Sequence, residues 1–143
     1  DADDFHSESA KAMMAANQSI TTDMRQQWID YMSKNLMKRA NQQQNIVLAY
    51  SGLVAQQRQQ LKRLGFRTFS LMLETNSSLI EQRLLIRKNH FAKSGLLASQ
   101  IATFEALTSQ EESTIKLNID RTIEQLTRVA VESISITKEF NNA

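Results

Sequence analysis

The sequence predicts an all-α protein, an antiparallel bundle of long amphipathic helices. Three observations lead to this fold class. Proline is absent and only three glycines occur in 143 residues, whereas sheet proteins need such residues at their many turns. Good helix formers such as alanine, leucine, glutamine, lysine and arginine dominate the remainder. Apolar residues also recur at intervals of three and four, which indicates one buried stripe per helix.

The first helix is expected over residues 5–40, because apolar residues recur at helical spacing from Ile20 to Tyr31. The polar stretch at 41–45 either turns or continues as helix, since glutamine is a good helix former. If it turns, a second helix covers residues 46–74.

Two more helices are expected, over residues 79–107 and 110–140. Ser78 and Glu81 have the S-x-x-E spacing of a capping box, in which two side chains satisfy free amides at a helix start. Thr108 and Glu111 repeat this spacing. The sequence therefore predicts helix starts near residues 78 and 109.

With all three breaks as turns, the chain is a single domain over residues 1–143, an up-down-up-down four-helix bundle with coiled-coil-like seams. If 41–45 stays helical, the alternative is an elongated three-helix bundle or a long helical hairpin. Gly65 and Gly95 either end helices or lie inside them at a close backbone approach. Their apolar neighbours favour the helix interior.

Charge is distributed unevenly along the chain. Residues 1–33 carry six acidic and two basic side chains, and residues 34–93 carry eleven basic and two acidic ones. From residue 94 onward there are seven acidic and four basic side chains, so the net charge of +2 conceals a basic middle. Either the acidic ends neutralise this middle when the helices pack, or it forms an anion-binding face.

The anion-binding alternative rests on helical spacing. Arg83 and Arg87 lie one turn apart, as do Arg58 and Lys62. The candidate residues for binding an anion or a partner are Arg58, Lys62, Arg63, Arg67, Arg83, Arg87 and Lys88.

No catalytic, cofactor-binding or metal-binding residue is predicted. His6 and His90 lack a glutamate or histidine at the helical spacing of a metal site. The sequence contains no G-x-S-x-G motif and no glycine-rich phosphate loop. The acidic start at residues 1–4 is interpreted as a solvated chain end rather than a cation site. We therefore expect a protein without enzymatic activity and without a cofactor.

The sequence favours protein–protein association, through self-association or docking to a helical partner. This prediction rests on the apolar helical stripes, on the absence of catalytic and metal-binding motifs, and on eight glutamines in the basic middle. One alternative is an extracytoplasmic sensor domain of a membrane receptor. Another is binding of nucleic acid or an anionic surface, although the chain has no nucleic-acid-binding motif and its basic residues surround the helix. A small anionic ligand would also suit the basic residues.

Through helical periodicity the pattern is similar to ligand-binding domains of bacterial receptors, to secretion-system components and to phasins. This similarity implies a helical bundle and no particular site residues. The longest apolar run, residues 46–50, is too short to span a membrane. The chain begins at Asp1 rather than methionine, which favours an exported or membrane-tethered protein while leaving the compartment unassigned.

Overall fold

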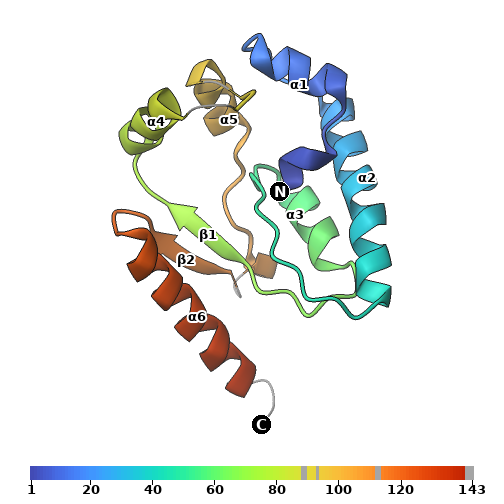
Figure 1. Cartoon of the computed structure of the whole chain (residues 1–143), viewed down its shortest axis with the longest axis vertical. Helices are drawn as coiled ribbons and strands as arrows, with labels where there is room; N and C mark the ends of the chain where they lie inside the picture. Colours follow the sequence, from blue (N-terminus) through green and yellow to red (C-terminus); the bar gives the residue numbers. More distant parts are fainter. Residues whose placement is uncertain (88–89, 93, 112–113, 141–143) are drawn as a thin grey trace. The chain divides into compact units, whose positions relative to one another are not determined.

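A computed structural model describes residues 1–87, 90–92, 94–111 and 114–140. Short helices alternate with extended segments, and two strands pair in parallel (Figure 1). This is an α/β structure, so the predicted all-α bundle of four long helices is wrong. The three-helix and hairpin alternatives fail for the same reason.

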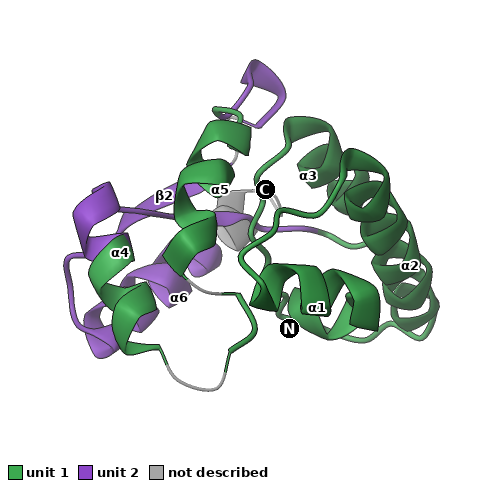
Figure 2. Ribbon diagram, turned by 90° about the horizontal axis from the view of Figure 1, so that it is seen from above, with its two compact units in different colours: residues 1–67, 81–106 green, residues 68–80, 107–143 purple. Residues whose placement is uncertain are grey.

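The chain divides into two compact units, which are described in turn (Figure 2). The first comprises residues 1–67 and 81–106, and the second comprises residues 68–80 and 107–143. That residues 1–143 form one domain stays a prediction. In chain order the elements are η1 (Ala2–Phe5), α1 (Glu8–Ala15), α2 (Thr22–Asn41), α3 (Ala55–Lys62), β1 (Leu71–Glu74), α4 (Ser77–Ile86), η2 (Ser94–Leu96), α5 (Leu97–Thr103), η3 (Ser109–Glu111), β2 (Ile115–Asn118) and α6 (Ile123–Phe140).

The predicted helix over residues 5–40 is interrupted between α1 and α2. Asn17 has a φ of 59°, the left-handed conformation that often follows a helix end. Thr21 then caps α2, because its hydroxyl accepts a hydrogen bond from Met24 N at 3.1 Å. The apolar spacing predicted one continuous helix here, but a polar segment that ends in a helix cap separates α1 from α2.

α2 supplies most of the core of the first unit. Tyr31, which the predicted stripe directs inward, is 59% exposed, so the buried face is offset from that stripe. The main core consists of Ala2, Trp28, Ile29, Met32 and Leu36. A second cluster, formed by Ala10, Met14, Ile20 and Leu96, joins α1 to η2.

The polar stretch at 41–45 is a turn, one of the two alternatives that the sequence left open. α2 ends at Asn41, and Gln43 has a φ of 57°. Gln43 therefore has a left-handed backbone conformation, whereas a continuous helix would need a right-handed one at this position.

The predicted helix over residues 46–74 is largely wrong, because only α3 is helical there. Before α3 the chain is extended, with Ile46 and Leu48 packed against the core and Val47 fully exposed. Apolar residues in so short a run fit a strand or a helix equally well. Gly65, at a φ of 85°, lies in a loop after α3 and not inside a helix.

The second unit contains the parallel strands, which the sequence analysis missed. Leu71 pairs with Ile115 and Leu73 with Leu117. Ile119 N extends the ladder by donating to Glu74 O at 3.0 Å. The four-residue strands lie inside stretches rich in helix formers, which is why their apolar residues were assigned to helices.

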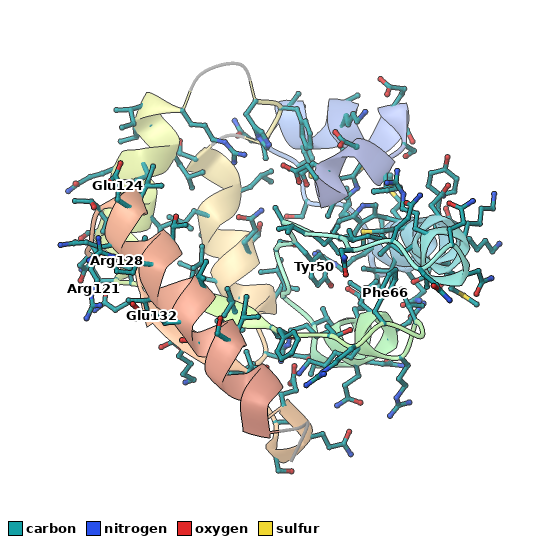
Figure 3. The ribbon with its side chains drawn as sticks, turned by 60° about the horizontal axis from the view of Figure 1, so that its bottom comes forward. Tyr50, Phe66, Arg121, Glu124, Arg128 and Glu132 are labelled. Carbon is teal, nitrogen blue, oxygen red and sulfur yellow. The ribbon has the colours of Figure 1, made fainter. Side chains whose placement is uncertain are left out.

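α6 packs on β2 and begins at residue 123, not near 110 as predicted. Its start is a capping box: Gln125 N donates to Thr122 Oγ1 at 3.3 Å, and Thr122 N donates to Gln125 Oε1 at 3.1 Å. Figure 3 shows the charged side chains that follow one another along this part of the chain, Arg121, Glu124, Arg128 and Glu132.

The two predicted capping boxes have different outcomes. α4 begins at Ser77, close to the predicted start, but the capping side chain is Asn76, whose Oδ1 accepts from Leu79 N at 2.9 Å. Thr108 N and its hydroxyl both donate to the Glu111 carboxylate, yet they enclose only the single turn of η3. The predicted helix over 79–107 is replaced by α4, η2 and α5, and residues 90–92 between α4 and η2 are not helical.

Among the described residues, no helix combines the length and the apolar character that crossing a membrane requires.

Candidate active site

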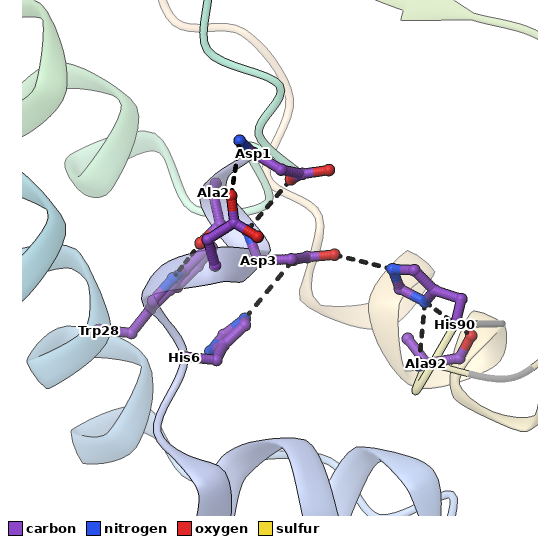
Figure 4. A network of polar contacts seen from close by, with 8 residues as sticks. Asp1, Ala2, Asp3, His6, Trp28, His90 and Ala92 are labelled. Atoms are coloured by element: carbon purple, nitrogen blue, oxygen red, sulfur yellow. Dashed lines mark hydrogen bonds and ion pairs between the residues drawn. The ribbon is translucent and has the colours of Figure 1, made fainter.

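The single helical turn η1, anchored by the buried Ala2, positions the site (Figure 4). Ala2 is buried, its nitrogen donates to Ala49 O at 2.9 Å, and its carbonyl accepts from Trp28 Nε1 at 2.9 Å. The Asp1 carboxylate accepts from Asp3 N at 3.1 Å. These bonds fix the backbone on both sides of Asp3, so its carboxylate projects from a rigid support.

Asp3 lies between the two histidines of the sequence. His90 Nε2 is 3.0 Å from Asp3 Oδ2, and His6 Nε2 is 3.7 Å from Asp3 Oδ1. Only the first distance is a hydrogen bond. The Asp3 side chain is 33% exposed, so the carboxylate is partly open to solvent.

His6 is held by aromatic rings. Its imidazole stacks on Trp28 with 4.1 Å between ring centroids, and the Phe91 ring meets it edge-on at 6.1 Å. Burial lowers the pKa of His6, and the negative charge of Asp3 only partly opposes this effect. His6 is therefore neutral at physiological pH. Its Nδ1 is buried, without a hydrogen-bond partner among the described residues.

An open pocket of about 540 Å³ adjoins this turn and runs between η1, the start of α1 and α2. Phe5, Trp28 and Tyr31 give it aromatic walls, while Gln27 and Lys11 add polar groups. Aromatic walls with a few polar groups are typical of pockets that bind small molecules.

Arg25 on α2 brings positive charge to the same region. It is close enough to lower the pKa of His6, and its own pKa is lowered by burial. Burial also raises the pKa of Tyr50 to about 12, although Arg58 and Arg25 oppose the rise. Within the part of the chain that the structure describes, no carboxylate lies within ion-pair distance of Arg25. A half-buried cation without a counter-charge favours an anionic ligand.

The structure places the predicted anion-binding residues in different environments. Arg58 is buried on α3, Lys62 is half-buried at the end of that helix, and Arg63 and Arg67 are exposed beyond it. Arg83 on α4 and Arg87 just after α4 are also exposed. Lys88 lies outside the described residues. Binding of an anion by any of these residues stays a prediction.

Arg58 has a structural role. Its Nη1 donates to Gly52 O at 2.7 Å and its Nη2 donates to Ala106 O at 3.2 Å, with the Phe104 ring 5.9 Å from the guanidinium carbon. Gly52 has a φ of 59°, which favours glycine. Arg58 therefore connects α3 to two extended segments, and its neighbour Tyr50 packs beside the core with Phe66 (Figure 3).

Two glutamines of α3, Gln57 and Gln60, face inward. Gln60 Nε2 donates to Asp30 Oδ1 at 2.9 Å, and Gln26 Nε2 donates to Asp30 Oδ1 and to Gln60 Oε1 at 2.9 and 3.1 Å. Gln57 is buried and donates to Gln26 Oε1 at 3.4 Å. These inward amides join α2 to α3 within the chain, whereas Gln42, Gln43, Gln44, Gln56 and Gln82 are exposed.

Sequence reasoning missed Asp3, His6 and His90. The acids were interpreted as a solvated chain end, and the residues around His6 and His90 predicted neither a metal site nor a catalytic base. The available signal was the D-x-D-D-x-H pattern from Asp1 to His6, which places three carboxylates and an imidazole within six residues. Among described residues, no group of three or more potential metal ligands is close enough to hold an ion.

Comparisons with known proteins identify the class of protein. No family model matches the chain. A probable gluconokinase from Dictyostelium discoideum is 28% identical over 139 residues, covering 88% of this chain and 70% of that protein. An unliganded crystal structure of a sugar kinase from Janibacter sp. HTCC2649 is 31% identical with a TM-score of 0.83, covering 94% of this chain and 78% of that one. A gluconokinase structure from Sinorhizobium meliloti 1021 is 22% identical with a TM-score of 0.81, covering 99% and 78% of the two chains.

The chain belongs to the family of sugar kinases that the Janibacter structure represents, which have the P-loop kinase fold. Its homologues named for a particular substrate are gluconokinases. These findings overturn the expectation of a non-enzymatic, coiled-coil association protein. The expectation failed because the residues of the site are brought together by the fold and follow no helical spacing.

Proposed function

We propose that the protein is a kinase that transfers a phosphoryl group to a hydroxyl of a sugar acid of the gluconate type, with Asp3 at the reacting hydroxyl. The observation that carries this proposal is the Asp3 carboxylate, fixed on the turn η1 and flanked by His6 and His90. It is supported by the gluconokinase homologues that match most of the chain.

In the proposed reaction the acceptor hydroxyl donates its hydrogen bond to Asp3 Oδ1. The acceptor oxygen forms a bond to the terminal phosphorus of a nucleoside triphosphate, and the bond from that phosphorus to the leaving diphosphate breaks. The hydroxyl proton passes to Asp3. Kinase catalysis depends mainly on positioning and charge stabilisation, so the rigid support of Asp3 matters more than strong basicity.

Arg25 is our candidate for the residue that binds the carboxylate of the acceptor. It is half-buried near His6 and Tyr50, and it has no acidic partner among the residues described. An arginine in such surroundings forms strong charge-assisted hydrogen bonds with a carboxylate. It would therefore distinguish a sugar acid from a neutral sugar.

Arg83 and Arg87 stay candidates for binding the transferred phosphoryl group. Arg87 is three residues before His90, and three residues of chain span at most ~11 Å. The backbone of Arg87, whose side chain is exposed, therefore lies within this distance of the backbone of His90, which bonds Asp3. Positive charge at this place would stabilise negative charge that develops during transfer. No residue of this chain is assigned to the phosphoryl donor, because the sequence contains no glycine-rich phosphate loop.

The test compares two acceptors that differ in charge. The purified protein is incubated with ATP and either gluconate or glucose, and ADP release is measured. We expect gluconate-dependent turnover and a kcat/KM for glucose at least about tenfold lower, the equivalent of losing about 1.4 kcal/mol of carboxylate binding. Equal activity with both acceptors, or no ADP release with gluconate, would contradict the proposal.

A further inference from the structure

His90 connects the segment after α4 to the Asp3 turn. Its side chain is only 16% exposed, and its Nε2 lies 3.0 Å from Asp3 Oδ2. Phe91 beside it stacks on His90 at 4.6 Å between ring centroids and contacts His6 edge-on. His90 and Phe91 therefore join this segment to the candidate active site by one polar contact, with Asp3, and one aromatic contact, with His6.

The hydrogen bonds at His90 Nδ1 indicate which of the two ring nitrogens carries the proton. Ala92 N donates to His90 Nδ1 at 3.0 Å, whereas Ala92 O is 3.3 Å from the same atom. The shorter bond requires a bare Nδ1, so the proton of a neutral ring lies on Nε2. His90 then donates to Asp3 Oδ2 and acts as a fixed donor.

The two oxygens of Asp3 are consequently not equivalent. Oδ2 accepts the hydrogen bond from His90, while Oδ1 lies 3.7 Å from His6, beyond hydrogen-bond range. Oδ1 therefore keeps its lone pairs for another donor. The bond to Oδ2 also stops the carboxylate from rotating about its own axis, which would otherwise exchange the two oxygens.

We propose that His90 is a positioning residue that acts through Asp3: it donates to Oδ2 and thereby directs Oδ1 toward the acceptor hydroxyl. This inference rests on the proposed function, since it assumes that Asp3 meets the acceptor. His90 does not contact the acceptor itself. Its loss should therefore reduce kcat and leave KM for the acceptor nearly unchanged.

Two substitutions separate this role from a general structural one. His90→Ala removes the donor, while His90→Gln places an amide N–H near the position of Nε2. We expect kcat to fall by up to ~10²-fold in His90→Ala, the scale of a misplacement of about 1 Å. His90→Gln should recover most of the loss, with KM within about threefold of the wild type in both variants. Thermal unfolding checks that both variants fold.

A spectroscopic measurement tests the geometry without turnover. Nitrogen-15 NMR of the histidine rings should show one imidazole with its proton on Nε2, and Asp3→Asn should shift that signal. Asp23→Asn, an exposed carboxylate on α2, is the matched control and should leave it unchanged.

The outcomes separate the inference from the proposed function. An active wild type with His90→Gln as impaired as His90→Ala, or with a loss confined to KM, would overturn the positioning role. A proton on Nδ1, or a signal insensitive to Asp3→Asn, would overturn it too. A wild type without gluconate-dependent turnover would overturn the proposed function, and with it the role of His90 in catalysis, whatever the NMR spectrum shows.

Discussion

Burial of His6 makes the stability of the protein depend on pH. The pKa of this imidazole is lowered from its ordinary value of 6.5, chiefly by burial. In the unfolded chain the ring takes up its proton near that ordinary value, so the unfolded state binds more protons just below it. The free energy of unfolding should therefore keep its full value above pH 6.5. It should decrease as the pH falls from 6.5 toward the lower pKa of His6 in the folded state. Urea unfolding at about pH 7.5 and about pH 5.5 measures the change.

The control for this prediction is His6→Phe, which keeps an aromatic ring beside Trp28 and removes the titrating group. Acidification should destabilise the wild type more than the variant. If both proteins lose the same free energy of unfolding, burial of His6 is not the cause.

Single residues also show what sequence spacing can and cannot predict. Asp3 and His6 are three positions apart, so their proximity could be predicted from the pattern at the start of the chain. Asp3 and His90 are 87 positions apart, and only the packing of η1 and Phe91 on α2 and its neighbours brings them together. Conversely, Arg58 and Lys62 do lie one turn apart on α3, but this spacing gave no indication that Arg58 would be buried.

At the scale of elements, the amide network should contribute measurably to the packing of α2 on α3. Gln60→Ala removes hydrogen bonds to Asp30 and Ser33 and the acceptor for Gln26. We expect the free energy of unfolding to fall by about 1–2 kcal/mol, because buried polar partners are left unsatisfied. Urea denaturation provides the measurement.

Gln56→Ala is the matched control, since Gln56 lies on the same helix and is exposed. It should change the free energy of unfolding by no more than about 0.5 kcal/mol. Equal effects of the two substitutions would show that α3 is not joined to α2 through its inward amides.

The start of α4 offers a direct comparison between the predicted cap and the observed one. Asn76 Oδ1 accepts from Leu79 N and from Ser78 Oγ, at 2.9 and 2.7 Å. Asn76→Ala should therefore cost about 1 kcal/mol of stability, the usual value of an N-cap. Ser78→Ala should cost less, because Ser78 gives only an exposed bond. Thermal or urea unfolding measures the stability of both variants. A larger loss of stability in Ser78→Ala than in Asn76→Ala would show that Ser78 is the cap.

One helix start and one turn could be predicted from the sequence. The start of α4 was predicted to within a residue, and the turn after α2 was one of two stated alternatives. The strands were missed because β1 and β2 have only four residues each, too few to distinguish alternation from helical periodicity. The start of α6 was missed although Thr122 and Gln125 have the T-x-x-Q spacing of a capping box.

At the scale of the whole molecule, composition misled the assignment of fold class. Few glycines and no prolines argue against hairpins, which need tight turns. Parallel strands need none, since the chain between them can be mostly helical. β1 and β2 are parallel, with α4 and α5 in the chain that connects them. Scarcity of turn residues therefore excludes a hairpin-rich protein but not an α/β one.

The uneven charge also has a different meaning in a kinase. A phosphoryl donor and a sugar acid are both anionic, so a basic middle segment favours their approach and opposes their mutual repulsion. Among the described residues, the exposed basic side chains of that segment are Lys34, Lys38, Arg39, Arg63, Arg67, Arg83 and Arg87. Arg58 cannot contribute in the same way, because its guanidinium is buried against backbone carbonyls.

The most direct test of the central claim is the kcat of Asp3→Asn at saturating gluconate, compared with the wild type and with Asp23→Asn. Asparagine keeps the size of the side chain and removes the proton-accepting charge. We predict a loss of ~10²–10⁴-fold in Asp3→Asn, the usual contribution of a catalytic base, with the unfolding temperature little changed and Asp23→Asn close to wild type. A kcat of Asp3→Asn within about twofold of the wild type would contradict the assignment of Asp3 to the reacting hydroxyl.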